Sequence, residues 1–162
     1  MRSKKRWAAF LLCAAMVLPA EVYAKELNTE KDKKFIWTLG SFMIDYYLKH
    51  AEPEAVELLE RAIGRGDICW HGIACTTHTE LLDRDLLNYS LDIGKHLDER
   101  FGRTTIASKM TDVPGHTRGL IAPLCDHGIR YLHIGVNASS MVPEVPDTFL
   151  WKQGNREIVV QY

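Results

Sequence analysis

The order of apolar and polar positions predicts short strands that alternate with helices. Residues 35–39 form a β-branched and aromatic run closed by Gly40, which is typical of a strand. Similar runs predict further strands at 67–74, 104–110 and 130–136. Between the strands, apolar residues recur at helical spacing in 42–49, 53–63, 83–101 and 117–127. This alternation predicts an α/β domain with a parallel sheet, either open or closed into a barrel.

The end of the chain adds a predicted hairpin, with strands at 148–151 and 157–162 around the turn Gln153-Gly154-Asn155. The four strands before it are fewer than a (β/α) barrel needs. The final run, Ile158 to Tyr162, is apolar, and natural domains seldom leave such a strand open at a sheet edge. We therefore expect residues 35–162 to form part of a barrel.

The first residues predict a targeting segment. Arg2, Lys4, Lys5 and Arg6 precede an apolar run from residue 7 to 18, and Val22-Tyr23-Ala24 offers small residues for cleavage. This pattern is typical of a signal peptide over residues 1–24, which predicts a secreted or periplasmic protein. The alternative is a membrane anchor, for which the run is short. Residues 25–34 are polar and charged, and are predicted to be a leader into the fold.

Composition narrows the class of protein. Hydrophobic residues make up 46% of the chain and charged residues 25%, which favours a folded domain over disorder. The net charge of -1 and the scattered basic residues argue against nucleic acid or an anionic membrane surface as a partner. Cys69, Cys75 and Cys125 follow the predicted cleavage site without a C-x-x-C pair, so a structural zinc site is not expected. Cys69 and Cys75 are predicted to be buried, and a disulfide between them stays open.

The segment from Lys109 to Gly119 carries the strongest candidate chemistry. Asp112 stands where a predicted strand ends, beside a Pro-Gly turn, and His116 follows four residues later. In parallel α/β folds the carboxyl ends of the strands face the active site. A carboxylate and an imidazole there can bind a metal, attack a sugar carbon or exchange a proton. The alternative is that Asp112 caps the turn and His116 bonds to backbone.

Two further strand ends carry polar side chains. His71 lies in the strand at 67–74, and His78 and Glu80 follow it, together with threonines that either contact a sugar or cap the next helix. All three are expected on the same rim as Asp112. Asn137 follows the strand at 130–136 and is placed to reach a ligand, whereas His133 within that strand is predicted to be a core histidine.

These residues resemble a known family. The run at 109–120 is similar to the segment of family-38 α-mannosidases that carries Asp, a Pro-containing turn and Gly-His-Ser. The matching residues are Asp112, Gly115 and His116, with Thr117 in place of Ser. The chain resembles an uncharacterised bacterial and fungal branch of that superfamily still more closely, and the similar segments are 35–41, 66–71, 76–83, 111–119, 131–137 and 157–160.

The resemblance implies a seven-stranded α/β barrel that binds a divalent metal, usually zinc, and acts on carbohydrate. It implies that Asp112 is both a metal ligand and the nucleophile of a retaining α-mannosidase-type hydrolysis. Substrate contacts are expected from His78, Glu80, His116 and Asn137.

The chain also departs from that family. No His-x-Asp motif precedes Phe35, and of the family's metal ligands only Asp112 has a match, whereas a catalytic zinc needs about three protein ligands. We therefore expect a truncated domain that is inactive alone, with a missing segment or a partner chain completing the barrel. The alternatives are a non-catalytic carbohydrate-binding remnant, a gene fragment and, more weakly, a polysaccharide deacetylase-like domain.

Overall fold

The computed structural model describes residues 35–113 and 115–162. The predicted signal peptide and polar leader lie outside the described residues. In the described part, strands and helices alternate as the sequence predicts, and they fall into two compact units. We describe each unit by itself.

The first unit comprises residues 35–39 and 43–70 among those described. Strands β1 (Trp37–Gly40) and β2 (Ile68–His71) form a two-stranded sheet, accompanied by helices α2 (Ser41–His50) and α3 (Pro53–Arg65). Helix α3 begins with a proline and ends before Gly66, whose φ of 74° is the left-handed conformation that closes helices. The buried hydrophobic side chains of this unit are Ile44, Tyr47, Leu59, Ala62, Ile63, Ile68 and Trp70.

The second unit contains residues 40–42 and 71–162. Its longest helix, α4 (Arg84–Phe101), confirms the prediction for residues 83–101. Asp83 caps it, because its carboxylate accepts a hydrogen bond of 2.8 Å from the Leu86 amide. The threonines before it are therefore not its caps. Instead, Thr79 begins the short 3-10 turn η1 (Thr79–Leu81).

The helix predicted at 117–127 is shorter than expected. The structure has the 3-10 turn η2 (Arg118–Leu120), followed by α5 (Ile121–Asp126). Pro123 explains the difference, because it has no N–H to donate four residues back, so it suits only the first turn of a helix. An α-helix that began at Thr117 would place Pro123 in its interior.

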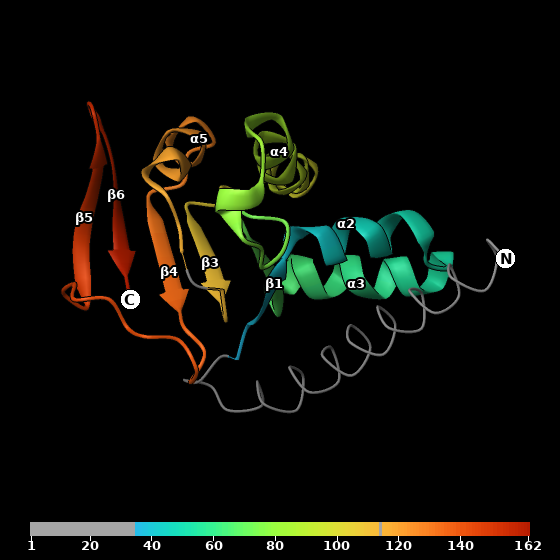
Figure 1. Cartoon of the computed structure of the whole chain (residues 1–162). Coiled ribbons are helices and arrows are strands. Elements are labelled where there is room, and N and C mark those ends of the chain that lie inside the picture. The colour runs from blue at the N-terminus through green and yellow to red at the C-terminus, as the bar shows by residue number, and fades with distance from the viewer. Residues whose placement is uncertain (1–34, 114) are drawn as a thin grey trace, which may run out of the picture. The chain divides into compact units, whose positions relative to one another are not determined.

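The second unit is built on a four-stranded sheet with the order β3-β4-β6-β5. Strands β3 (Ala107–Thr111), β4 (Tyr131–Gly135) and β6 (Arg156–Gln161) are parallel, and β5 (Thr148–Gln153) is antiparallel to β6. Figure 1 shows the arrowheads of the three parallel strands pointing the same way and that of β5 pointing back. The hairpin turns at Gly154, whose φ is 61°.

This order corrects the expectation that the last strand is an open apolar edge. Strand β6 pairs with β4 on one side and with β5 on the other, so its buried Ile158 and Val160 lie within the sheet. Strand β5 is the outer strand instead, and it carries Lys152, a residue that discourages pairing between sheet edges.

The two faces of this sheet differ. One face supplies the alternate residues of the core, which pack with Leu87, Leu91, Leu120, Ile121 and Leu124 of the helical layer. On the other face, Lys109, Tyr131 and His133 are exposed in the described part of the chain. The prediction that His133 is a core histidine is therefore wrong. Side chains alternate between the two faces along a strand, so His133 points to the face opposite to that of the buried Leu132 and Ile134.

The sheets show a mixed α/β fold with parallel strands and helices. Residues 35–162 contain six strands in a two-stranded and a four-stranded sheet, and no closed seven-stranded barrel is seen among them. None of the helices in this described part is long and apolar enough to cross a membrane.

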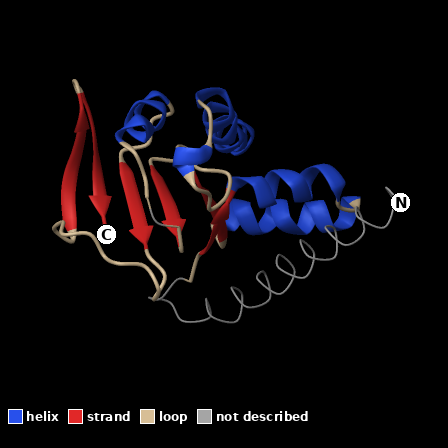
Figure 2. Ribbon diagram, viewed as in Figure 1, coloured by secondary structure: helices blue, strands red, loops and turns tan. Residues whose placement is uncertain are grey.

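Strands β3 and β4 end on the same side of the sheet, which we call the carboxyl edge. The segment after β3 carries Asp112, Gly115 and His116, and the segment after β4 carries Asn137. Figure 2 shows the long connection from β4 to β5 as a tan loop that begins at this edge. The carboxyl edge is where ligand sites form in parallel α/β folds.

Candidate active site at the carboxyl edge

Asp112 directly follows β3 and has an unusual backbone. Its φ is 64°, and it is the one non-glycine among the described residues with a positive φ. Its amide donates to the Gly135 carbonyl at 2.7 Å, and its carbonyl accepts from Asn137 Nδ2 at 3.3 Å. The ends of β3 and β4 therefore hold the Asp112 backbone on both sides, while the residue itself stays exposed.

This conformation has a cost. In the left-handed region the Cβ atom comes too close to the carbonyl oxygen of the backbone, although Asp tolerates this strain better than most residues. Strained backbone of this kind persists where the surroundings fix it, and it gathers at functional sites. The structure thus holds the backbone of an exposed aspartate at the end of a parallel strand.

His116 lies four residues further along the same segment and is half-buried. Its Nδ1 lies 2.8 Å from Thr79 Oγ1, and its Nε2 is buried with no hydrogen-bond partner among the described residues. Burial lowers the pKa of His116, Glu80 opposes that shift, and His78 adds to it. Near neutral pH the ring is therefore neutral, with one nitrogen available to a ligand or a water.

His78 and Glu80 complete a small polar cluster with His116. His78 Nδ1 lies 3.3 Å from Glu80 Oε1. The pKa of Glu80 is lowered, first by a hydrogen bond from its own backbone amide and then by His78 and His116. Glu80 also packs on the Asp112 segment, because a Cβ at Gly115 would lie 3.3 Å from Glu80 Oε1. The cluster thus joins η1 to the segment that carries Asp112.

The side chain of Asn137 donates to the backbone of Asp112 and also accepts hydrogen bonds within its own loop. Its Oδ1 accepts from the Ser139 amide at 2.9 Å and from Ser140 Oγ at 3.1 Å. The side chain therefore holds the loop after β4 against Asp112. Its role toward a substrate stays a prediction.

The structure brings the five candidate residues to one edge in two sets. Asp112 pairs with Asn137, and His116 groups with His78 and Glu80. Sequence reasoning missed Thr79 as the partner of His116, because a threonine near a helix start is ordinarily assigned to capping. Nothing in the local sequence reveals a contact between residues 37 positions apart.

A metal site would need several donor side chains close together. No group of three or more His, Cys, Asp and Glu side chains in residues 35–113 and 115–162 is placed to hold a metal ion. The described residues therefore do not fit a catalytic zinc, which takes about three protein ligands.

His71 ends β2, and its pKa is lowered to about 4, first by burial and then by the Lys109 ammonium. Its Nδ1 is buried with no partner in the described structure. The three described cysteines are free, so no Cys69–Cys75 disulfide forms. Cys75 is exposed rather than buried, because it follows β2 in a loop where the alternation of the strand no longer applies.

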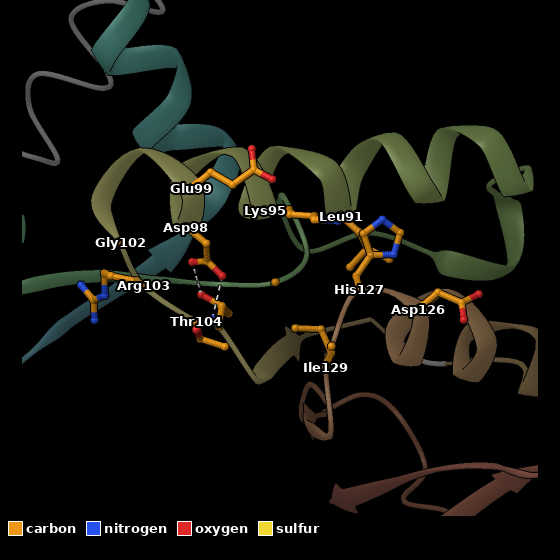
Figure 3. Close-up of a pocket in the computed structure, with 14 residues that line it drawn as sticks. Leu91, Lys95, Asp98, Glu99, Gly102, Arg103, Thr104, Asp126, His127 and Ile129 are labelled. Carbon is orange, nitrogen blue, oxygen red and sulfur yellow. Dashed lines mark hydrogen bonds between the residues drawn. The ribbon is translucent and has the colours of Figure 1, made fainter.

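A cavity lies at the opposite edge of the sheet, where β3 and β4 begin (Figure 3). It measures about 530 Å³ and is lined by the end of α4 and the segments that precede β3 and β4. Asp98 in its wall is already occupied, since its carboxylate accepts from the amide and hydroxyl of Thr105 at 2.6 and 2.7 Å. The amino ends of parallel strands ordinarily serve stability, and this bonding fits that role.

Comparisons with known proteins place the fold. No protein-family model and no curated protein matches the chain. Among solved structures, the chain is similar to a 4-alpha-glucanotransferase from Thermococcus litoralis, with a TM-score of 0.67 at 15% identity. The match covers 96% of this chain and 25% of that one, so the chain spans a quarter of the enzyme's length. At this identity, the likeness shows a shared fold.

Proposed function

We propose that this chain is a carbohydrate-active domain of the glycosidase type, with Asp112 as its chemical centre. The observation that carries the proposal is the left-handed backbone of Asp112, held at the carboxyl end of β3 by Gly135 and Asn137. The fold shared with a 4-alpha-glucanotransferase supports the broad class. The resemblance of residues 109–120 to family-38 α-mannosidases supports the finer assignment to that lineage.

Retaining hydrolysis assigns two tasks to the protein. A carboxylate oxygen of Asp112 would bond to the anomeric carbon as the glycosidic bond breaks, and a general acid would protonate the leaving oxygen. Water would then release the sugar and restore the carboxylate. The described residues suit the first task, because the Asp112 side chain is exposed.

Two groups of the polar cluster, Glu80 and His116, do not suit the second task. A general acid must hold a proton near neutral pH, yet the pKa of Glu80 and the pKa of His116 are both lowered. We therefore expect sugar binding with little or no turnover by this chain alone. A zinc-dependent reaction would need ligands from outside the described residues.

The carbohydrate-binding alternative shares the same site and differs only in lacking turnover. The polar cluster favours it, because an ionised Glu80 and a neutral His116 accept and donate hydrogen bonds to hydroxyl groups without chemistry. We propose the carbohydrate as the partner in both cases.

The test is calorimetry of methyl α-mannoside with the full chain and two variants. Asp112→Asn keeps a side chain that tolerates the left-handed backbone and removes the charge. Asp85→Asn is the matched control, since it removes an exposed carboxylate in the first turn of α4. We expect binding to weaken about tenfold or more in Asp112→Asn, the loss typical of a charge-assisted hydrogen bond, and to persist in Asp85→Asn.

Equal binding by all three proteins, or binding by none, would refute the proposal. Zinc titrated into the same samples should give no heat that depends on Asp112. Hydrolysis of an aryl α-mannoside that disappears in Asp112→Asn would overturn the expectation of an inactive chain while keeping the glycosidase assignment.

A further inference from the structure

A cavity of about 370 Å³ lies on the helix-bearing side of the four-stranded sheet, near the carboxyl edge. Its walls include Phe149 and Trp151 of β5 and Tyr162 beyond β6. Phe149 and Trp151 pair with the buried Val160 and Ile158, so they stand on the core face of the sheet. We call this space the aromatic cavity. It shares Gly115 and His116 with the segment that follows β3, and its other walls come from β4, β5, the loop between them and Tyr162.

The loop from β4 to β5 forms another wall with apolar side chains. Met141 and Val145 line the cavity and are nevertheless 93% and 39% exposed. Exposed apolar side chains that gather beside a cavity are typical of binding sites. A methionine adapts its shape to different ligands because it is unbranched and flexible.

The polar component of the cavity comes from His116. This residue lines it, and its buried Nε2 has no partner in the described part of the chain. A buried nitrogen without a hydrogen bond is costly, and a ligand group that reaches it would recover that cost. Because the other ring nitrogen already contacts Thr79, either tautomer leaves Nε2 ready for a hydroxyl, which both donates and accepts.

Together these features define the ligand. Small-molecule sites ordinarily exceed about 300 Å³ and combine apolar walls with a few polar groups. Flat aromatic ligands stack on aromatic side chains, and one hydroxyl matches one nitrogen. A sugar carries hydroxyls around its whole ring, and most of them would lack partners against Phe149, Met141 and Val145.

We propose that the aromatic cavity binds a small aromatic alcohol of the phenol class, with Trp151 and Phe149 contacting the ring and His116 bonding the hydroxyl. His116 belongs both to the aromatic cavity and to the polar cluster, so a bound ligand would contact the Asp112 segment through His116. The proposal does not depend on sugar binding, and either can fail while the other stands.

The experiment is a titration of the full chain with phenol, followed by the indole N–H resonances of its tryptophans. Trp151→Phe identifies the resonance of Trp151. That resonance should shift and saturate at roughly millimolar phenol, the affinity expected for a ligand of about seven heavy atoms. The resonances of Trp37 and Trp70 should stay in place, because neither residue lines the cavity.

Variants test the walls without disturbing the core. Met141→Ala removes a 93% exposed side chain from the cavity, and His116→Phe removes both ring nitrogens, including the Nε2 that would bond the hydroxyl. We expect each to weaken phenol binding several-fold, whereas Leu150→Ala should not, because Leu150 is exposed and occupies the alternate, opposite face of β5. A Trp151 resonance that does not shift when phenol is added refutes the proposal. So does a resonance that responds to methyl α-mannoside and not to phenol, which would make the cavity a sugar site.

Discussion

Gly94 offers the sharpest test of the packing around α4. A Cβ at this position would lie 2.8 Å from the Gly72 carbonyl oxygen and 3.5 Å from its carbon. Because backbone atoms cannot rotate away as a side chain does, Gly94→Ala forces α4 and the residue after β2 apart. The segment that begins at Gly72 leads to His78 and Glu80, so the same close approach supports the candidate site.

The magnitude follows from two opposing contributions. Alanine is favoured over glycine inside a helix by about 1 kcal/mol. Overpacking of a closely packed interior costs about 1–3 kcal/mol. For Gly94→Ala we therefore expect a net loss of about 1 kcal/mol in the free energy of unfolding.

Gly64 is the matched control, because it lies in α3 and a Cβ there would meet nothing within 4 Å. Gly64→Ala should stabilise the protein by up to about 1 kcal/mol, since only the helix preference applies. Urea unfolding followed by circular dichroism measures both variants. If Gly94→Ala stabilises the protein as much as Gly64→Ala does, the close contact between α4 and Gly72 is wrong.

Two further predictions concern stability. Asp83→Ala should lower the free energy of unfolding by about 1 kcal/mol, because it removes the acceptor for the Leu86 amide, and Asp83→Ser should restore most of it in the same urea assay. His71 should make stability depend on pH, because its pKa falls from 6.5 to about 4 on folding. Between these pH values the unfolded chain binds a proton at His71 and the folded chain does not, so the free energy of unfolding should decline as pH falls from about 6.5 to 4. In His71→Gln this decline should be smaller. An unchanged slope would mean that His71 titrates normally in the folded protein.

The sequence predicted most elements of the fold because their signals are local. Periodicity located the strands and α4 to within a few residues, and glycines marked where helices end. One error arose where distant residues decide. The apolar sequence of β6 reveals that the strand is buried but not that β4 and β5 flank it. The error at His133 is local instead, because its alternation with the buried Leu132 and Ile134 already places it on the outer face of β4.

The candidate site divides in the same way. The sequence by itself placed Asp112, His116, Glu80, His78 and Asn137 at strand ends, since a polar residue after an apolar run ends a strand. Only the tertiary structure decided that Asp112 takes a left-handed backbone, because that conformation depends on hydrogen bonds to residues 23 and 25 positions away. It likewise decided that Thr79 contacts His116 and that His116 lines the aromatic cavity. Each of these features joins residues of separate segments, and the spacing along one segment carries no record of that proximity.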